Sequence, residues 1–143
     1  MDAPPPNPNV IRTEKAPKPV GPYPHARRVG SMLFLSGIGP RTPGTGEIPG
    51  LLRDGAGSVI GHDIEVQTRA CLDNIKTILE EAGSSLEKVV DVTVYLTDMQ
   101  RDFATFNRVY GEYLGHVQPT RTTVGVDSLP TPIAIELKVI ASS

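Results

Sequence analysis

The sequence has little of what metal centres and disulfide frameworks require. Its 143 residues include one cysteine, Cys71, and no tryptophan. One thiol excludes an internal disulfide and a thiolate cluster for zinc or iron and sulfur, and it fits a reducing compartment. We therefore expect a cytoplasmic protein, in which Cys71 is a core residue on the apolar face of a predicted helix.

Signatures of nucleotide-dependent and metal-dependent enzymes are also missing. The chain has no H-E-x-x-H, C-x-x-C, G-x-S-x-G or P-loop pattern, and Gly37-Ile38-Gly39 lacks the third glycine and the helix of a dinucleotide fingerprint. His25, His62 and His116 stand far apart in sequence, which is more typical of surface or turn residues than of metal ligands. We expect neither a metal nor a cofactor.

Charge and hydrophobic runs do not point to nucleic acid or to a membrane. The 14 Lys and Arg residues are interspersed with 16 Asp and Glu residues, for a net charge of −2. A nucleic-acid surface needs a basic stripe, and none is present. No run approaches the roughly 18 apolar residues of a membrane span, and the first nine residues lack the pattern of an export signal.

Length and proline distribution predict one domain with a short extension. A chain of 143 residues suits one hydrophobic core. Proline recurs through Pro19, so we expect residues 1–17 to form a flexible arm and residues 18–143 to form the folded domain.

Hydrophobic periodicity predicts an α+β domain. Strands are expected at 25–29, 31–37, 89–97, 119–126 and 133–140, with a hairpin near 55–57 inside a long loop. One helix is capped by Asp63 and ended by Gly83, and a second runs from Asp102 to Gly115. Val90 and Phe103 are among the side chains expected on buried faces. This order predicts two helices on one face of a mixed sheet and an uncovered second face, which an oligomer would bury.

One arginine and one glutamate lie on the last two predicted strands, which we expect to be neighbours. Arg121 opens the first, and Glu136 lies among apolar residues in the second. A guanidinium binds a carboxylate bidentately, and a partly buried glutamate with a raised pKa moves protons near neutral pH. The pair predicts chemistry on a small organic acid, and a structural ion pair is the alternative.

Six blocks of sequence point to a known family. They resemble the reactive-intermediate deaminase (Rid, or YjgF-like) family from about residue 18 to residue 141, and they are Gly21-Pro22-Tyr23, Leu35-Ser36-Gly37, residues 94–99, residues 103–110, residues 119–124 and Ile135-Glu136. The resemblance implies a chorismate-mutase-like α+β fold with a six-stranded sheet. It also implies a homotrimer whose sheets form a central barrel with a site between subunits, and a hexamer of two stacked trimers is the alternative assembly. Such proteins hydrolyse enamines and imines without metal or cofactor.

The resemblance also assigns roles to residues. Arg121 matches the arginine that binds the substrate carboxylate, and Glu136 would place a water against the imine carbon. Tyr23, Ser36 and Gly37 match substrate-binding positions, and His25 is added because it follows Tyr23 closely. The alternatives are a packing role for Tyr23, a backbone hydrogen bond for Ser36, and an ion pair between Glu136 and Lys138.

Two departures from the common family pattern resemble the 2-aminomuconate deaminase branch. They are Arg41, after Ser36-Gly37-Ile38-Gly39-Pro40, and a longer connection that contains Ile48-Pro49-Gly50. The substrate of that branch is a dicarboxylate, and Arg41 is the candidate for its second carboxylate, a solvated loop arginine being the alternative. The predicted reaction in aromatic catabolism yields 2-oxohex-3-enedioate and ammonia. The competing predictions are a broad 2-aminoacrylate or 2-iminopropanoate deaminase and a non-catalytic ligand-binding or chaperone-like module.

Overall fold

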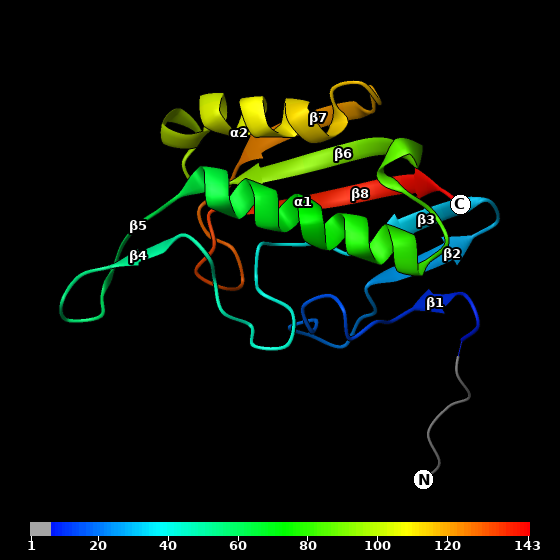
Figure 1. The fold of residues 1–143 in the computed structure, drawn as a ribbon, viewed down its shortest axis with the longest axis horizontal. Helices are drawn as coiled ribbons and strands as arrows, with labels where there is room; N and C mark the ends of the chain where they lie inside the picture. The colour runs from blue at the N-terminus through cyan, green and yellow to red at the C-terminus, as the bar shows by residue number, and fades with distance from the viewer. Residues whose placement is uncertain (1–6) are drawn as a thin grey trace, which may run out of the picture.

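The computed structural model describes residues 7–143, in which a six-stranded mixed sheet carries two helices on one face (Figure 1). The elements in chain order are β1 (Val10–Ile11), β2 (Ala26–Val29), β3 (Met32–Leu35), β4 (Leu51–Arg53), β5 (Val59–His62), α1 (Ile64–Glu81), the 3-10 turn η1 (Leu86–Lys88), β6 (Val89–Leu96), α2 (Met99–Leu114), β7 (Thr120–Gly125) and β8 (Ile135–Ser142). The predicted α+β class is confirmed. The hairpin expected near 55–57 is also confirmed, because β4 and β5 pair as a separate two-stranded sheet.

The C-terminal strand lies in the middle of the large sheet. The strand order is β1-β2-β3-β8-β6-β7, and β8 is antiparallel to both β3 and β6. Strand β7 pairs in parallel with the outer edge of β6. Arg121 on β7 and Glu136 on β8 are therefore separated by β6, and the expectation that their strands are neighbours is wrong. The reason is that α2 connects β6 to β7 as a crossover, which leaves the other edge of β6 for β8.

Helix α1 begins and ends where its sequence predicts. The Asp63 carboxylate accepts a hydrogen bond from the Val66 N–H at 3.1 Å, which satisfies one of the free donors of the first turn. Gly83 follows the last turn with a φ of 81°, a left-handed conformation that favours glycine.

Helix α2 begins one turn earlier than expected. Its N-cap is Asp98, whose carboxylate accepts from the Arg101 N–H at 3.1 Å, and the helix starts at Met99. Asp102, the expected start, is a buried helix residue that pairs with the Arg101 guanidinium at 2.8 Å. Both aspartates have the chemistry of a cap, so the sequence pattern alone does not choose between them.

The core lies between the helices and the sheet. Alternating residues of the strands point into it, and α1 and α2 cover them with their apolar sides; fully buried examples are Leu33, Leu35, Val92, Val94, Ile135, Leu137, Val139, Leu72, Ile75, Ile78, Phe106 and Leu114. Two expectations fail. Val90 is 46% exposed because the register between β6 and β8 shifts between Val89 and Asp91. Phe103, in the first half of α2, is 37% exposed.

The described part of the N-terminal segment packs against the sheet. The expected arm covers residues 1–17, of which residues 1–6 lie outside the described residues. From there on, β1 pairs with β2, and Ala16 is only 3% exposed in the core. Proline-rich composition is compatible with this arrangement because an edge strand needs only one row of backbone hydrogen bonds.

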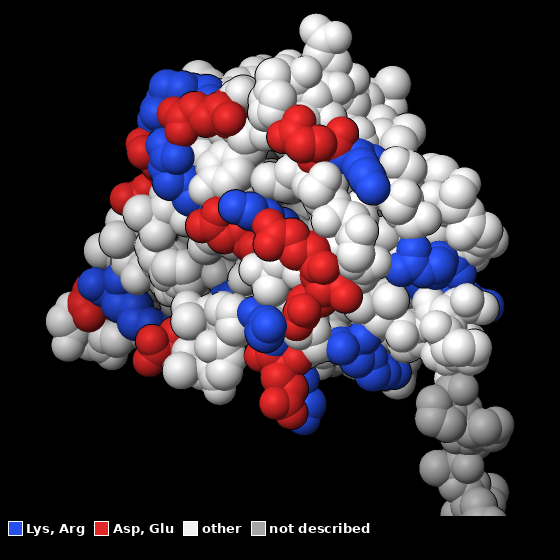
Figure 2. Space-filling view, turned by 45° about the vertical axis from the view of Figure 1, so that its right-hand side comes forward, with Lys and Arg blue, Asp and Glu red and all other residues white. Residues whose placement is uncertain are grey.

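Charged side chains of both signs are mixed on the surface. Figure 2 shows Lys and Arg residues next to Asp and Glu residues on the face that it draws. Between α1 and α2, Arg69 and Arg108 each contact Glu65 and Glu112, at distances from 2.6 to 3.5 Å. No helix among residues 7–143 is both long enough and apolar enough to span a membrane. Within the same residues, no three His, Cys, Asp or Glu side chains gather as a metal site would require.

Candidate functional site

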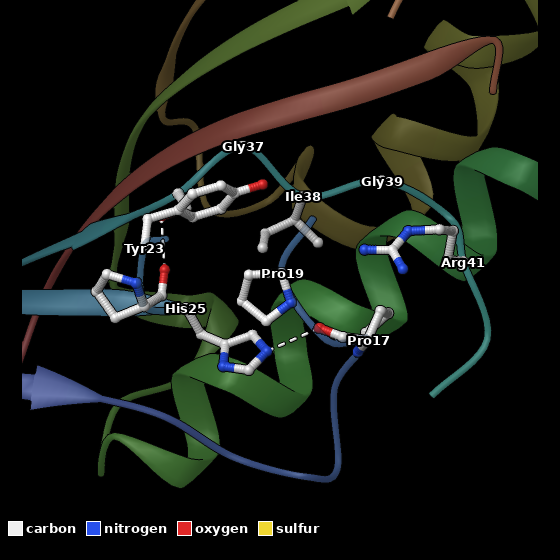
Figure 3. A pocket seen from close by; sticks show the side chains of 10 residues that line it. Pro17, Pro19, Tyr23, His25, Gly37, Ile38, Gly39 and Arg41 are labelled. Atoms are coloured by element: carbon white, nitrogen blue, oxygen red, sulfur yellow. Dashed lines mark hydrogen bonds between the residues drawn. The ribbon is translucent and has the colours of Figure 1, made fainter. Parts of the chain in front are cut away.

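Two adjoining hollows at one end of β8 gather most of the predicted site residues. Figure 3 shows the first of them, with Tyr23, His25, Gly37 and Arg41 among its lining residues. Six of the seven line them: Tyr23, His25, Ser36, Gly37, Arg41 and Glu136. Each hollow has a volume of about 30 Å³, which is room for a water molecule or two. Ligand pockets usually measure roughly 300 Å³ or more, so these hollows form only part of a substrate site.

The Glu136 carboxylate is half-buried against a glycine. A Cβ atom at position 37 would lie 2.8 Å from the carboxyl carbon of Glu136, so only glycine leaves room for the carboxylate in this position. Burial raises the pKa of Glu136 above its ordinary value. Lys138, the alternative ion-pair partner, donates instead to the backbone oxygen of Leu35. The environment of Glu136 therefore favours the protonated carboxyl over the charged carboxylate.

Tyr23 combines a packing contact with a place in the hollows. Its N–H donates to the Gly21 oxygen at 2.9 Å in a tight turn, and a Cβ atom on Gly21 would lie 2.9 Å from the edge of the ring. The ring also lines both hollows. The packing role and the site role, which the sequence offered as alternatives, are thus compatible.

Ser36 and His25 use their polar groups on the backbone. The Ser36 hydroxyl donates to the Pro24 oxygen at 2.7 Å, which is the alternative expected for this residue. The His25 ring, 4% exposed, accepts from the Thr13 N–H at Nδ1 (3.3 Å) and meets the Pro17 oxygen with Nε2 (2.8 Å). The proton therefore sits on Nε2. Through these two contacts His25 holds the N-terminal segment beside the hollow that it lines.

Arg41 lies in the same hollow as Glu136. One guanidinium nitrogen, Nη2, donates to the Lys18 oxygen at 2.6 Å. The side chain also borders a larger and more open hollow of about 840 Å³, together with Arg12 and Lys18. A guanidinium has five N–H donors, so the contact with Lys18 leaves capacity to bind a carboxylate.

Arg121 lies on the opposite face of the sheet from Glu136. Arg121 is paired with Val92, on the face that the helices cover, whereas Glu136 is paired with Tyr95, on the open face. The two residues are also separated by three positions along the strands, or roughly 10 Å, and by two strand spacings. Within one copy of the chain, the two side chains therefore extend from opposite faces of the sheet.

Aromatic rings of α2 hold Arg121. Its guanidinium carbon lies 5.9, 5.2 and 4.8 Å from the ring centres of Phe103, Phe106 and Tyr110. An open hollow of about 560 Å³ borders this cluster and is lined by Phe103 and Thr123, among others. Sequence reasoning assigned neither residue to a site, although the two-residue spacing places Thr123 on the same face as Arg121.

Comparisons with known proteins agree with one another. A sequence profile described as Endoribonuclease L-PSP matches residues 13–143. A RutC family protein of Pyrococcus abyssi is 49% identical over 132 residues, which cover 92% of this chain and 94% of that protein. The Escherichia coli protein named "Putative reactive intermediate deaminase TdcF" is 38% identical over 135 residues, 92% of this chain and 95% of that protein. The crystal structure of E. coli TdcF with bound serine has a TM-score of 0.80 at 37% identity, and covers 94% of this chain and 98% of that one.

Proposed function

This chain belongs to the endoribonuclease L-PSP (Rid) family, and on that premise we propose that it is a broad-specificity reactive-intermediate deaminase. It hydrolyses small enamines and imines of 2-amino acids, such as 2-aminoacrylate and its tautomer 2-iminopropanoate, to a 2-oxo acid and ammonia. One observation carries the proposal: the desolvated Glu136 carboxylate lies in a hollow that Tyr23 and Arg41 also line. The name of the E. coli relative supports the same reaction class.

The reaction consumes one water, and every step moves a proton. The enamine first tautomerises to the imine by moving a proton from nitrogen to carbon. Glu136 then takes a proton from a water molecule as the water oxygen bonds to the imine carbon, and Glu136 passes that proton to the nitrogen. The resulting carbinolamine transfers its hydroxyl proton to the nitrogen, the C–N bond breaks, and ammonia leaves with a carbonyl in its place. Much of the rate comes from positioning and from charge stabilisation, since an imine carbon is already electrophilic.

Each site in this proposal draws on two copies of the chain. Glu136, Gly37 and Tyr23 come from one copy, and Arg121 with Phe103 comes from the next. The placement of Arg121 and Glu136 on opposite faces supports this arrangement, as does the small volume of the hollows in one copy. A homotrimer whose open sheet faces meet in a central barrel would form three such sites, and two trimers could stack as a hexamer.

A second candidate substrate is 2-aminomuconate, a dicarboxylate. The observation that favours it is the position of Arg41, a cation that lines the hollow of Glu136 and is oriented by the Lys18 oxygen. A charge-assisted hydrogen bond contributes about 1.5 to 3 kcal/mol, which corresponds to roughly a tenfold to hundredfold preference over a monocarboxylate. The comparisons support the broad activity more directly, because the E. coli relative is named a putative deaminase of reactive intermediates.

The test is ammonia release by the purified protein from freshly generated 2-aminoacrylate and, at equal concentration, from 2-aminomuconate. The Glu136→Gln variant serves as the control for spontaneous hydrolysis. We expect turnover of 2-aminoacrylate well above that control. A strong preference for 2-aminomuconate that Arg41→Ala removes would establish the second candidate instead. No ammonia from either substrate, with 2-oxo acids still bound, would contradict both and leave a ligand-binding module.

A further inference from the structure

The segment 37–41 lines the site outside the regular strands and joins the sheet by an isolated β-bridge at Ile38. It follows β3 and contributes Gly37, Gly39 and Arg41 to the hollow that contains Glu136. A segment of this kind needs other groups to fix its backbone, because loose chain would let Gly37 move away from the carboxylate that it contacts.

Side chains of α1 supply those contacts. The Asn74 amide nitrogen, Nδ2, donates to the Gly39 oxygen at 3.0 Å and to the Arg41 oxygen at 2.9 Å. One turn earlier, the Cys71 thiol donates to the Ile38 oxygen at 3.0 Å. Asn74 is 5% exposed and Cys71 is fully buried. Three carbonyl groups of the segment are thus bound from the helix behind it.

The other side of the segment is tied to the strand of Glu136. Ile38 exchanges two backbone hydrogen bonds with Leu137, both at 2.9 Å. Leu137 follows Glu136 directly, so any shift of the segment between α1 and β8 changes the space around the carboxylate. The Arg41 side chain depends on the same backbone, because its Cα position sets how the guanidinium reaches the Lys18 oxygen.

We propose that Asn74 is a positioning residue for the deaminase site, because its two hydrogen bonds to the Gly39 and Arg41 oxygens fix the segment that places Gly37 and Arg41 in the hollow of Glu136. This inference rests on the proposed function for its catalytic consequence. Cys71 contributes the weaker of the two anchors, since a thiol is a poor donor. Burial keeps it protonated by raising the pKa of its thiol far above the ordinary value, so it acts as a donor and not as a nucleophile.

The first test compares Asn74→Ala with Thr77→Ala. Thr77 lies one turn further along α1 and bonds only the Asp73 oxygen within the helix, so it is a matched control. We expect Asn74→Ala to lower kcat tenfold or more, and to raise KM for a dicarboxylate more than for a monocarboxylate. Thr77→Ala should stay within twofold of the wild type. A folded Asn74→Ala protein with unchanged kcat and KM would overturn the proposal. If that variant does not fold, Asn74→Ser, which keeps one donor, takes its place with the same criteria.

The second test needs no substrate and separates this inference from the proposed reaction. The Glu136 carboxyl is titrated by ¹³C NMR in the wild type, in Asn74→Ala and in Thr77→Ala. A loosened segment admits water beside the carboxylate, so the pKa of Glu136 should fall toward its ordinary value in Asn74→Ala alone. An unchanged titration in that variant would show that Asn74 does not position the site, whatever the protein catalyses.

Discussion

The two surfaces that bear the predicted catalytic residues differ in how they treat charge. Glu136 occupies a tight hollow against Gly37, where burial penalises its charged form. Arg121 lies across three aromatic rings at the open edge of the sheet, where its charge is stabilised. Burial thus disfavours the charged form of Glu136, whereas the aromatic rings favour the charged form of Arg121.

In the proposed two-copy site, one copy would supply the proton acceptor and its neighbour would supply the carboxylate anchor. A surface with a stable, partly exposed cation can attract a carboxylate before any partner is present. A desolvated base works best when the site is closed and water is limited. Joining the two surfaces only on assembly would place the reactive group and the substrate anchor together in the oligomer alone.

The largest effect on activity is expected from two single variants, one without the Arg121 guanidinium and one without the Glu136 carboxylate. Arg121→Ala and Glu136→Gln should each lower kcat/KM at least a hundredfold, because one loses the carboxylate anchor and the other the proton acceptor. Oligomers formed by co-expressing the two variants should regain up to about a quarter of the wild-type ammonia release. The reason is that random assembly places an intact Glu136 of one copy beside an intact Arg121 of the next in that share of sites. Mixed oligomers with no recovered activity would place both residues in one copy's site.

Gly37→Ala should lower kcat roughly tenfold to hundredfold, because the new methyl group would displace the Glu136 carboxylate from its position. Gly55→Ala is the matched control, since a Cβ atom there meets no neighbour within 4 Å. Steady-state kinetics of both variants measure the effect. Equal activity of the two would contradict the contact between Gly37 and the working carboxylate.

A smaller change tests the aromatic support of Arg121. Phe103→Leu removes one of the three rings and should raise KM about twofold to fivefold, as expected for a cation–π contact of about 0.5 to 1 kcal/mol. Phe103→Tyr keeps a ring and should restore the wild-type KM. A normal KM in Phe103→Leu would mean that the ring does not help to orient the guanidinium.

The smallest expected effect is on stability and depends on pH. The pKa of Glu136 is raised in the folded protein relative to the unfolded chain, so its protonated form stabilises the fold at low pH and this contribution is lost as pH rises through the folded pKa. Above that pH the charged carboxylate is a cost that Glu136→Gln avoids. The variant should therefore unfold a few degrees higher than the wild type at pH 8, and the difference should vanish near pH 4. A lower Tm at pH 8 would contradict the desolvated state of Glu136.

Local patterns predicted the elements well and their arrangement only in part. The alternation of Ile133, Ile135, Leu137 and Val139 identified the buried face of β8, and all four are 5% exposed or less. The register shift that exposes Val90 depends on how β8 pairs with β6, and a pattern within one strand carries no information about that pairing. Which of two aspartates caps α2 was likewise decided by packing.

The candidate site shows the same limit. The sequence motifs identified Tyr23, Gly37 and Glu136 as site residues, and in the structure these residues line one hollow. The sequence also named Arg121, but the separation of Arg121 from Glu136 follows from strand order, in which β6 lies between them. Asn74 was missed because local periodicity does not indicate which buried amide binds the backbone of a distant segment.

The central position of β8 has a consequence for how the protein is made. Because β8 pairs with both β3 and β6, the sheet cannot close until β8 has been synthesised. Until then β3 and β6 present unpaired edges of the kind that seed aggregation. A nascent chain that lacks β8 would hold two half-sheets, so this chain should depend on chaperones during synthesis more than a protein whose central strands are made first.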